Sequence, residues 1–336
     1  MDQEEPLSMI ENQKKKVSIV IPTKNAENTI SDLIITLLDQ KTPWLFEILV
    51  IDSGSRDNTV DIIKSFPSVK LIEIPPSDFG HGKTRNFGIK NTTGDFIAIL
   101  TQDAIPINNC WLENFVASIN QDERIAGVFG RHIANKIASP FTRNELEQHF
   151  DGFLNEPIVG LDDKKRYQID EGYRKFLYFF SDNNALIRRS VWEKFPYPEV
   201  DFAEDQAWAK VIIEAGYLKA YSSDAVVYHS HDYGFFERLQ RSFEETYALR
   251  RLFGYKHGYG LKGLIKSFIG MTYRDINISF RNNLFISDFK YVIRMPLDHF
   301  MRSIGTYLGS KAEHLPSFIR NKLSRDKNLM LGTNIK

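Results

Sequence analysis

The stretch that decides the fold is VSIVIPTKNAE (Val17–Glu27), in which a short apolar run is followed by Pro22 and a polar loop. A run of this kind predicts a buried strand. The pattern recurs in ILVIDSGSRD (Ile48–Asp57) and IAILTQDA (Ile97–Ala104). Stretches with helical spacing of apolar residues lie between these runs, which indicates βαβ units and a mostly parallel sheet. Ligands bind such sheets beyond the carboxyl ends of the strands, where these polar loops are expected to lie.

The remaining elements follow from the same periodicities. Strands are expected at Val17–Ile21, Glu47–Ile51, Val69–Ile74, Phe96–Leu100, Ile125–Phe129, Asn184–Ile187 and Ala225–Tyr228. Helices are expected after Asn25, which could cap the first of them, after Asp57, over Thr84–Ile89 and over Phe202–Ala215. The charged stretch 151–175 is expected to be a loop. These elements indicate a polar N-terminal flank (1–15), an α/β domain (16–235) and a helical basic extension (236–336).

Composition restricts the class of protein. The chain has 336 residues, 42% of them hydrophobic, which is enough for one large domain or for one domain with an extension. The single cysteine, Cys110, excludes an intramolecular disulfide and a multi-cysteine zinc site, and favours a reducing compartment. The polar first residues do not form a signal peptide, and no apolar run reaches the roughly 18 residues that span a bilayer. A cytoplasmic protein, soluble or peripheral to a membrane, is therefore expected.

Charge is unevenly distributed along the chain. The net charge is zero, but residues 237–336 carry 18 Lys and Arg against 8 Asp and Glu. Such a basic segment is either a solvated surface or a surface that contacts anionic lipid or a phosphorylated substrate.

Asp52 follows an expected strand and precedes a glycine-containing loop. A carboxylate at this place can accept hydrogen bonds from a pyrimidine base or from a ribose hydroxyl group, and Gly54 lets the backbone turn closely. The alternative is a turn in which Asp52 caps the next helix.

The segment Gly80–Asn86 (GHGKTRN) ends like a phosphate-binding P-loop, but Ser occupies position 77, where that motif needs Gly. Arg85, near the start of the expected helix, could instead pair with a diphosphate or a base carbonyl group. A surface salt bridge is the alternative for Arg85.

Three further groups could carry chemistry. Asp103, which ends Thr101-Gln102-Asp103, offers the oxygen ligands that hard divalent cations prefer. Glu204 and Asp205 open an expected helix, where burial and mutual repulsion could tune one of them as a general base; the alternative is that both only stabilise the helix start. His229 and His231 would share one face of an extended segment, although an isolated histidine is more often structural.

In this order, the motifs resemble those of the inverting, nucleotide-sugar-dependent glycosyltransferases of family 2, most closely their rhamnosyltransferase branch, over residues 15–235. The resemblance implies a GT-A-type α/β fold with a helical extension. It implies that Asp205 is the base and that Glu204 orients it or binds the acceptor. The implied nucleotide and donor contacts are Pro22, Thr23, Asn25, Asp52, Gly54, Arg85, Gln102 and Asp103. The implied acceptor or sugar contacts are Asp182, Asn183 and Trp208, and the implied metal ligands are Asp103, His229 and His231.

The segment Thr101-Gln102-Asp103 departs from most of the family, which has Asp-x-Asp there. Only the last Asp remains, although TQDA is itself typical of the rhamnosyltransferase branch. The implied cofactor is a divalent cation, Mg²⁺ or Mn²⁺. The implied donor is dTDP-L-rhamnose, and the acceptor is a lipid-linked bacterial glycan such as an O-antigen or capsule precursor. Contact with the inner face of an anionic membrane and a homo-oligomer are compatible with this interpretation, and no nucleic-acid partner is expected.

Several alternatives remain open. A UDP- or GDP-sugar donor would leave the fold and the reaction class unchanged. A nucleotidyltransferase would have a basic, glycine-rich first loop, and a dinucleotide-dependent oxidoreductase would have G-x-G-x-x-G after the first strand; neither is present. A nucleotide-binding module without turnover is the remaining alternative, and the presence of both Asp205 and His229 argues against it.

Overall fold

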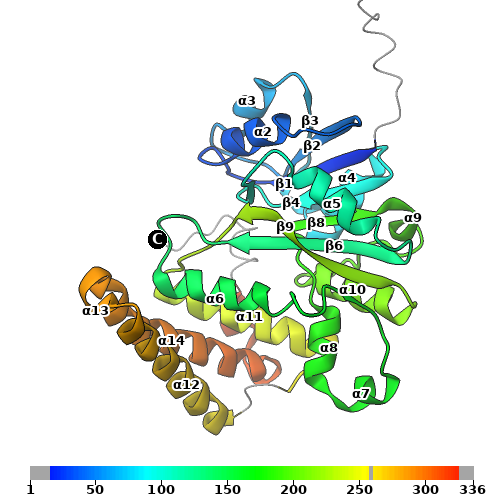
Figure 1. Ribbon diagram of the computed structural model, residues 1–336. Helices are drawn as coiled ribbons and strands as arrows, with labels where there is room; N and C mark the ends of the chain where they lie inside the picture. Colours follow the sequence, from blue (N-terminus) through cyan, green and yellow to red (C-terminus); the bar gives the residue numbers. More distant parts are fainter. Residues whose placement is uncertain (1–15, 257–259, 325–336) are drawn as a thin grey trace, which may run out of the picture. The chain divides into compact units, whose positions relative to one another are not determined.

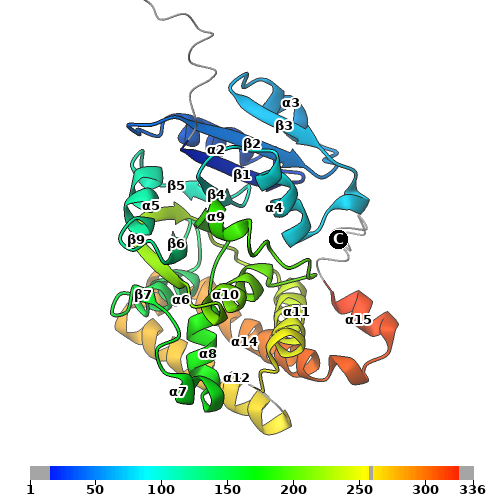
Figure 2. The same cartoon turned by 90° about the vertical axis from the view of Figure 1, so that its right-hand side faces the viewer.

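The computed structural model describes residues 16–256 and 260–324, which divide into two compact units (Figures 1 and 2). Among these residues, the first unit contains 16–133, 148–200 and 204–229, and the second contains 134–147, 201–203 and the chain from 230 onward. The expected flank 1–15 and the last part of the expected extension, 325–336, lie outside the described residues. The second unit includes the segment 134–147, which the sequence pattern did not associate with the C-terminal extension.

The first unit is built on one mixed sheet. Its strands in the described chain are β1 (Val17–Thr23), β2 (Phe46–Asp52), β3 (Val69–Glu73), β4 (Phe96–Leu100), β5 (Ile105–Pro106), β6 (Ile125–Ile133), β7 (Ile158–Val159), β8 (Asn184–Arg188) and β9 (Leu218–Tyr228). Their order is β3-β2-β1-β4-β8-β6-β9-β5, with β7 paired to β9. The first four strands are parallel, as expected, whereas β8 is antiparallel to both of its neighbours. The α/β class is confirmed, and the sheet is mixed: β6 and β9 also pair in parallel, whereas β5, β7 and β8 pair antiparallel to their neighbours.

Helices cover both faces of this sheet. They are α2 (Ile30–Leu38), α3 (Thr59–Lys64), η1 (Pro76–Asp78), α4 (His81–Lys90), α5 (Trp111–Ile119), α7 (Lys164–Ile169), α8 (Glu171–Tyr178), α9 (Arg189–Trp192) and α10 (Glu204–Glu214). On one face, α2 and α5 bury Leu33 and Phe115 against strand residues such as Ile19. On the other face, α4 comes so close that a Cβ atom at Gly88 would lie 2.5 Å from Val20 Cγ1. The burial of both faces explains why the strands are almost continuously apolar.

The expectation of a loop over 151–175 is wrong for part of that stretch. Helices α7 and α8 lie within or across it, and each begins at an aspartate whose side chain accepts a backbone N–H of the first turn. Asp163 accepts from Arg166 and Asp170 accepts from Tyr173. These N-caps allow short, charged helices to form where the apolar periodicity is weak.

The second unit is helical. It contains α11 (Phe235–Phe253), α12 (Gly260–Arg281), α13 (Leu284–Ser287), α14 (Phe289–Ser310), η2 (Ala312–His314) and α15 (Ser317–Leu323), together with the first part of α6 (Pro140–Asp151). Helices α11 and α14 pack closely, because a Cβ atom at Gly305 would lie 2.3 Å from the Leu239 carbonyl oxygen. Leu239 and Phe243 of α11 form a small apolar core with Ala312 and Leu323.

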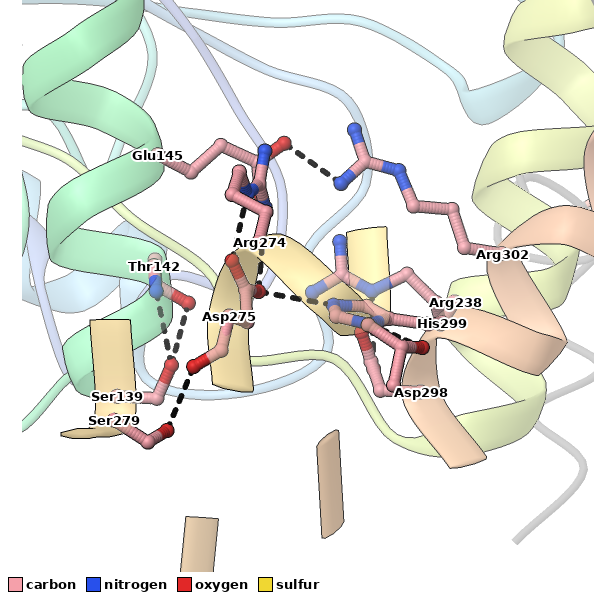
Figure 3. A network of polar contacts seen from close by, with 11 residues as sticks. Ser139, Thr142, Glu145, Arg238, Arg274, Asp275, Ser279, Asp298, His299 and Arg302 are labelled. Atoms are coloured by element: carbon pink, nitrogen blue, oxygen red, sulfur yellow. Dashed lines mark hydrogen bonds and ion pairs between the residues drawn. The ribbon is translucent and has the colours of Figure 1, made fainter. Parts of the chain in front are cut away.

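Charged side chains also hold this helical unit together (Figure 3). Asp275 is 1% exposed, and its carboxylate lies 3.0 Å from His299 Nε2 and 2.6 Å from Arg274 Nε. Glu145 of α6 pairs with Arg302 of α14 at 2.6 Å. Burial alone would raise the pKa of Asp275, but the hydrogen bonds from His299 and Arg274 hold it below its ordinary value. The network therefore keeps a buried negative charge paired between α12 and α14.

Candidate active site

The polar loops of the sequence motifs meet at one edge of the sheet in the first unit. They follow β1, β2 and β4, precede β8, and are joined by the N-termini of α4 and α10 and by the end of β9. Parallel strands bring their carboxyl ends to the same edge, and β8 begins there because it runs in the opposite direction to β4.

Asp52 shapes the loop after β2. Its side chain is 1% exposed, and Oδ2 accepts the backbone N–H groups of Gly54 and Ser55, each at 2.9 Å. Gly54 has φ +84°, and a Cβ atom there would lie 2.6 Å from Pro76 Cγ, so only glycine fits without movement. Ser53 donates twice to the carbonyl oxygen of Thr23 and so ties the ends of β1 and β2 together. The loop thus contains the turn of the alternative interpretation, and nucleotide binding by Asp52, Pro22 and Thr23 stays a prediction.

The loops after β1 and β4 are linked by Gln102. Its side chain accepts from the Lys24 backbone N–H at 2.7 Å and donates to the Lys24 carbonyl oxygen at 3.1 Å. Asn25, next to Lys24, has φ +51°, and its Oδ1 accepts the backbone N–H of Arg56 at 2.9 Å. The side chains of Gln102 and Asn25, which were expected to contact the nucleotide, hold neighbouring loops in position through these hydrogen bonds.

Arg85 lies at the centre of a buried acidic cluster. Its Nη1 lies 2.7 Å from Glu204 Oε1. Its Nε lies 3.1 Å from Asp182 Oδ2, an ion pair whose geometry does not make a hydrogen bond. The three side chains are 7% exposed or less. Burial disfavours the charge of Arg85, but Glu204 and Asp182 raise its pKa above the ordinary value. These buried ion pairs exclude the surface salt bridge that was the alternative for Arg85, and Arg85 neutralises carboxylates inside the protein. Its contact with a diphosphate or a base carbonyl group stays a prediction.

Asp205 lies at the start of α10 beside this cluster. Burial and the neighbouring charge of Glu204 raise its pKa to about 7, although the Gln206 N–H and Arg85 act in the opposite direction. The Asp182 backbone N–H donates to Asp205 Oδ2 at 3.3 Å. The pKa of Asp182 is raised well above its ordinary value by burial and by the charges of Asp205 and Glu204. A half-buried carboxylate with a pKa near neutrality has the property that a general base requires.

Two residues outside the predicted set hold this cluster. Tyr197 donates its hydroxyl group to Asp182 Oδ1 at 2.9 Å, and Asn86 donates to the Tyr197 carbonyl oxygen at 2.8 Å. Asn86 also accepts from Trp192 and from the Tyr197 backbone N–H. Asn86 belongs to the HGKTRN motif and could have been singled out from it, whereas no local pattern marks Tyr197.

Asp103 and His229 form the strongest candidate for a metal site. Asp103 Oδ1 lies 3.6 Å from His229 Nε2. Metal–ligand distances of about 2.0–2.5 Å place two ligands of one ion roughly 3–4 Å apart, so this pair fits a divalent cation. His231 is two residues further along the chain and belongs to the second unit.

A histidine that the sequence analysis did not identify lies next to His229. The ring of His132, on β6, is 5% exposed and meets the His229 ring edge-on, with 5.1 Å between centroids. Its Nε2 is buried without a hydrogen-bond partner in the described residues. Burial, with smaller contributions from His229 and His149, lowers the pKa of His132 well below its ordinary value. His132 is therefore uncharged and lines the site beside His229.

The expected acceptor residues differ in position. Asp182 belongs to the acidic cluster, and the Asn183 carbonyl oxygen accepts from the Thr101 backbone N–H at 3.5 Å, so this segment lies beside the loop of Asp103. The expectation for Trp208 is wrong, because its side chain is fully buried and donates to the Phe195 carbonyl oxygen. Trp208 is part of the core behind the site and does not face a ligand.

The second unit contains a cavity of about 250 Å³. Its lining combines aromatic with hydrogen-bonding side chains, among them Phe202, Tyr247, Arg251, Glu244 and Arg320. Such combinations suit polyhydroxylated ligands, which offer both apolar C–H faces and hydroxyl groups.

Comparison with known proteins gives the following similarities. The sequence profile described as "Glycosyl transferase family 2" matches residues 18–195. The O-antigen chain rhamnosyltransferase RfbN of Salmonella typhimurium is 32% identical over 310 residues, which cover 90% of this chain and 91% of that protein. The O-antigen chain rhamnosyltransferase WbaN of Salmonella anatum is 30% identical over 308 residues, covering 89% and 90%.

Solved structures share the fold. A mannosyltransferase of Pyrobaculum calidifontis in complex with GDP-Man and Mn²⁺ superposes with a TM-score of 0.55 at 15% identity, covering 88% of each chain. Residues 1–349 of Staphylococcus aureus TarS in complex with UDP superpose with a TM-score of 0.50 at 17% identity, covering 90% of this chain and 93% of that one. Within residues 16–256 and 260–324, no helix combines the length and apolar character needed to cross a membrane.

Proposed function

The chain belongs to glycosyltransferase family 2, and we propose that it transfers L-rhamnose from dTDP-L-rhamnose to a hydroxyl group of a bacterial surface-glycan precursor, with inversion at the anomeric carbon. Two rhamnosyltransferases that match about nine tenths of the chain support the sugar and the glycan class. The observation that carries the reaction is Asp205, a carboxylate with a pKa of about 7 at the edge of the sheet. Because the acceptor is a lipid-linked precursor, we place the enzyme at the cytoplasmic face of the membrane.

Asp205 acts as the general base. It takes the proton of the acceptor hydroxyl group while that oxygen attacks the anomeric carbon of the donor sugar from the side opposite the diphosphate. The new glycosidic bond forms as the bond to the diphosphate oxygen breaks, and the nucleoside diphosphate leaves. One displacement of this kind inverts the configuration of the anomeric carbon.

Glu204, Arg85 and Asp182 prepare this base. The charge of Glu204 raises the pKa of Asp205, whereas Arg85 limits the rise, and the Asp182 backbone N–H orients Oδ2. With a pKa near neutrality, Asp205 is largely ionised above pH 7 and is basic enough to accept a proton in the transition state. Glu204, which pairs with Arg85, therefore orients and tunes the base in this proposal.

Asp103 and His229 would hold a divalent cation, with His231 as a further candidate ligand. When bound, Mg²⁺ or Mn²⁺ would neutralise the diphosphate of the donor. The 3.6 Å separation of Asp103 and His229 supports this assignment. The loops of Pro22, Thr23, Asn25, Asp52 and Gly54 would hold the nucleotide. Ser53 and Asn25 tie these two loops together, and Gln102 ties the first of them to the loop after β4.

We place a sugar of the acceptor at the cavity lined by Phe202, because its aromatic and hydrogen-bonding side chains suit a polyhydroxylated ligand. Tyr247 would offer an apolar face and Arg320 hydrogen bonds. Arg320→Ala should raise the KM for the acceptor several-fold and leave the KM for the donor unchanged. Equal changes in the KM for the acceptor and the KM for the donor would show that the acceptor does not bind in this cavity.

The decisive test is calorimetric binding of dTDP, UDP, GDP and CDP, each with Mg²⁺, Mn²⁺ or EDTA, followed by transfer assays with dTDP-L-rhamnose. Tight dTDP binding that is strengthened by a cation, together with turnover, supports the proposal. Preference for UDP or GDP would keep the fold and the reaction but change the donor. Nucleotide binding without turnover of any donor would favour a non-catalytic module.

A further inference from the structure

We propose that helices α12, α13 and α14 form a surface that lies on an anionic lipid bilayer. Eleven of the 23 large apolar side chains exposed in the described chain lie between residues 260 and 300. Figure 1 shows α12 and α14 side by side, with α13 at one end of the pair. An apolar concentration of this kind on a water-exposed surface marks an interaction site.

The apolar residues form a stripe along each long helix. On α12, Leu261, Ile265, Ile269 and Tyr273 follow one another at intervals of four residues and are between 48% and 69% exposed. On α14, Phe289, Ile293 and Leu297 repeat the same interval and are between 46% and 63% exposed. Residues four positions apart lie on one side of a helix, so each helix presents a continuous apolar face.

The burial pattern of α12 differs from that of a helix on a water-soluble protein. Its fully buried residues are the polar Asp275 and Ser279, which belong to the charged network of the second unit, whereas the aliphatic Leu261, Ile265 and Ile269 are exposed. Its other aliphatic residues, Leu264, Ile276 and Ile278, are half-buried. A water-facing helix normally buries its apolar side. The outer side of α12 is therefore suited to a low-dielectric environment.

The charged residues of this region indicate what kind of surface it would contact. The exposed charged residues between 260 and 300 are all basic: Lys262, Lys266, Arg281, Lys290 and Arg294. Each directly follows an exposed apolar residue, and successive helical residues are about 100° apart, so a basic stripe borders each apolar stripe. The acids of this region, Asp275, Asp288 and Asp298, are buried or half-buried. Apolar side chains beside lysine and arginine match the acyl and anionic head-group layers of a bilayer.

A lipid surface accounts for these features better than a second copy of the chain. A two-fold contact would place this patch against itself, and its lysines would then face lysines with no exposed acid between 260 and 300 to pair with them. Since no described helix can span a membrane, the helices would lie in the interface, parallel to its plane. This inference does not depend on the identity of the donor or the acceptor.

The test is flotation of the full chain with phosphatidylcholine vesicles that contain or lack phosphatidylglycerol. We expect the protein to float with the anionic vesicles and to be released by salt, because Lys and Arg attraction is screened. Lys262→Glu with Lys266→Glu and Lys290→Glu should lower the bound fraction at least about tenfold. The matched control, Lys41→Glu with Lys90→Glu and Lys194→Glu on the first unit, reverses the same number of exposed charges and should leave it unchanged. Failure of the wild type to float, or equal loss in the control, would overturn the proposal.

A second measurement avoids reliance on charge variants that could fail to fold. A polarity-sensitive dye on Ile269→Cys, in a Cys110→Ser background, should shift to the blue on anionic vesicles. The same dye on Ile169→Cys, an 85% exposed position in α7, should not shift. A shift that instead follows protein concentration without lipid, together with a dimer in sedimentation velocity, would assign the surface to a second copy and reject the lipid.

Discussion

The guanidinium group of Arg85 lies 2.7 Å from the carboxylate of Glu204, and both side chains are shielded from water. This contact joins the start of α4 to the start of α10. It places one positive charge among Glu204, Asp182 and Asp205, and so limits how far the pKa values of Asp182 and Asp205 rise. The predictions about the candidate base follow from this charge balance.

Asp205→Asn should abolish transfer while leaving donor binding intact. The amide keeps the shape of the side chain but cannot accept the acceptor proton, so kcat should fall by about 10²–10⁴-fold. Single-turnover assays and calorimetry with the nucleotide measure the two properties separately. Asp61→Asn, an exposed change on α3, is the control. Turnover near that of the wild type would exclude Asp205 as the base.

The pH dependence of kcat/KM should show an acidic limb with its midpoint at about pH 7, because Asp205 must be ionised to act. Glu204→Gln removes the like charge that raises the pKa of Asp205, so the limb should move to lower pH. An unmoved limb in this variant would show that another group titrates.

The stability of the folded chain should depend on pH through the same group. Because the pKa of Asp205 is higher in the folded chain than in the unfolded chain, the contribution of Asp205 to the free energy of unfolding falls as pH rises from about 4 to about 7.

Arg85→Met should destabilise the first unit, because it leaves Asp182 and Glu204 buried without their cation. Loss of one partner of a buried ion pair costs about 3–5 kcal/mol. Asp182, whose pKa burial already raises and Arg85 lowers, can reduce this cost by taking up a proton. The loss should therefore be larger at pH 8 than at pH 5, which denaturant titrations at both pH values would measure. Arg124→Met, at an exposed pair with Asp122, should change stability little at either pH. Equal losses for both variants would contradict the role given to Arg85.

Asp103→Asn should remove most of the effect of Mg²⁺ or Mn²⁺ on nucleoside-diphosphate binding. Asparagine retains the size of the side chain but loses the charge that a hard cation requires. Titrations with cation and with EDTA should therefore give similar affinities in the variant and different affinities in the wild type. Asp78→Asn, beside Lys83 in the first unit, should behave as the wild type does. If the cation still strengthens nucleoside-diphosphate binding in Asp103→Asn, Asp103 is not a ligand of the metal.

Gly305→Ala should destabilise the helical unit by roughly 1–3 kcal/mol, because its methyl group would overlap the Leu239 carbonyl oxygen at the contact of α11 and α14. Gly270→Ala is a matched control within α12: nothing lies within 4 Å of the added atom. It should stabilise the helix by about 0.5–1 kcal/mol, because alanine loses less backbone entropy there. Thermal unfolding that ranks the two variants in the opposite order would contradict the close packing of α11 and α14.

The sequence predicted the parts of this structure that depend on local pattern. The apolar runs that begin with Val17 became β1, β2, β3 and β4 close to their expected bounds, because alternation and length determine what a strand can bury. The helix expected over Phe202–Ala215 is α10, which begins two residues later, at Glu204, and ends at Glu214. Asn25 was expected to cap the first helix, but the helix begins after Thr29 without a side-chain cap, and Asn25 instead accepts a hydrogen bond from Arg56. That partner comes from the loop after the next strand, which no local pattern contains.

By itself, then, the sequence determined an α/β sheet, the loops at its edge and the adjacent acids Glu204 and Asp205 at a helix start, because each follows from neighbouring residues. The choice of Asp205 as the candidate base came from the family resemblance. Only the tertiary structure decided that Arg85 meets Asp182 and Glu204, that Trp208 is enclosed in the core, and that one aliphatic stripe of α12 faces outward. Burial and ion pairing depend on which distant segments meet and on how much water they exclude. These quantities have no signature in the local spacing of residues, and they set the charge of the candidate site.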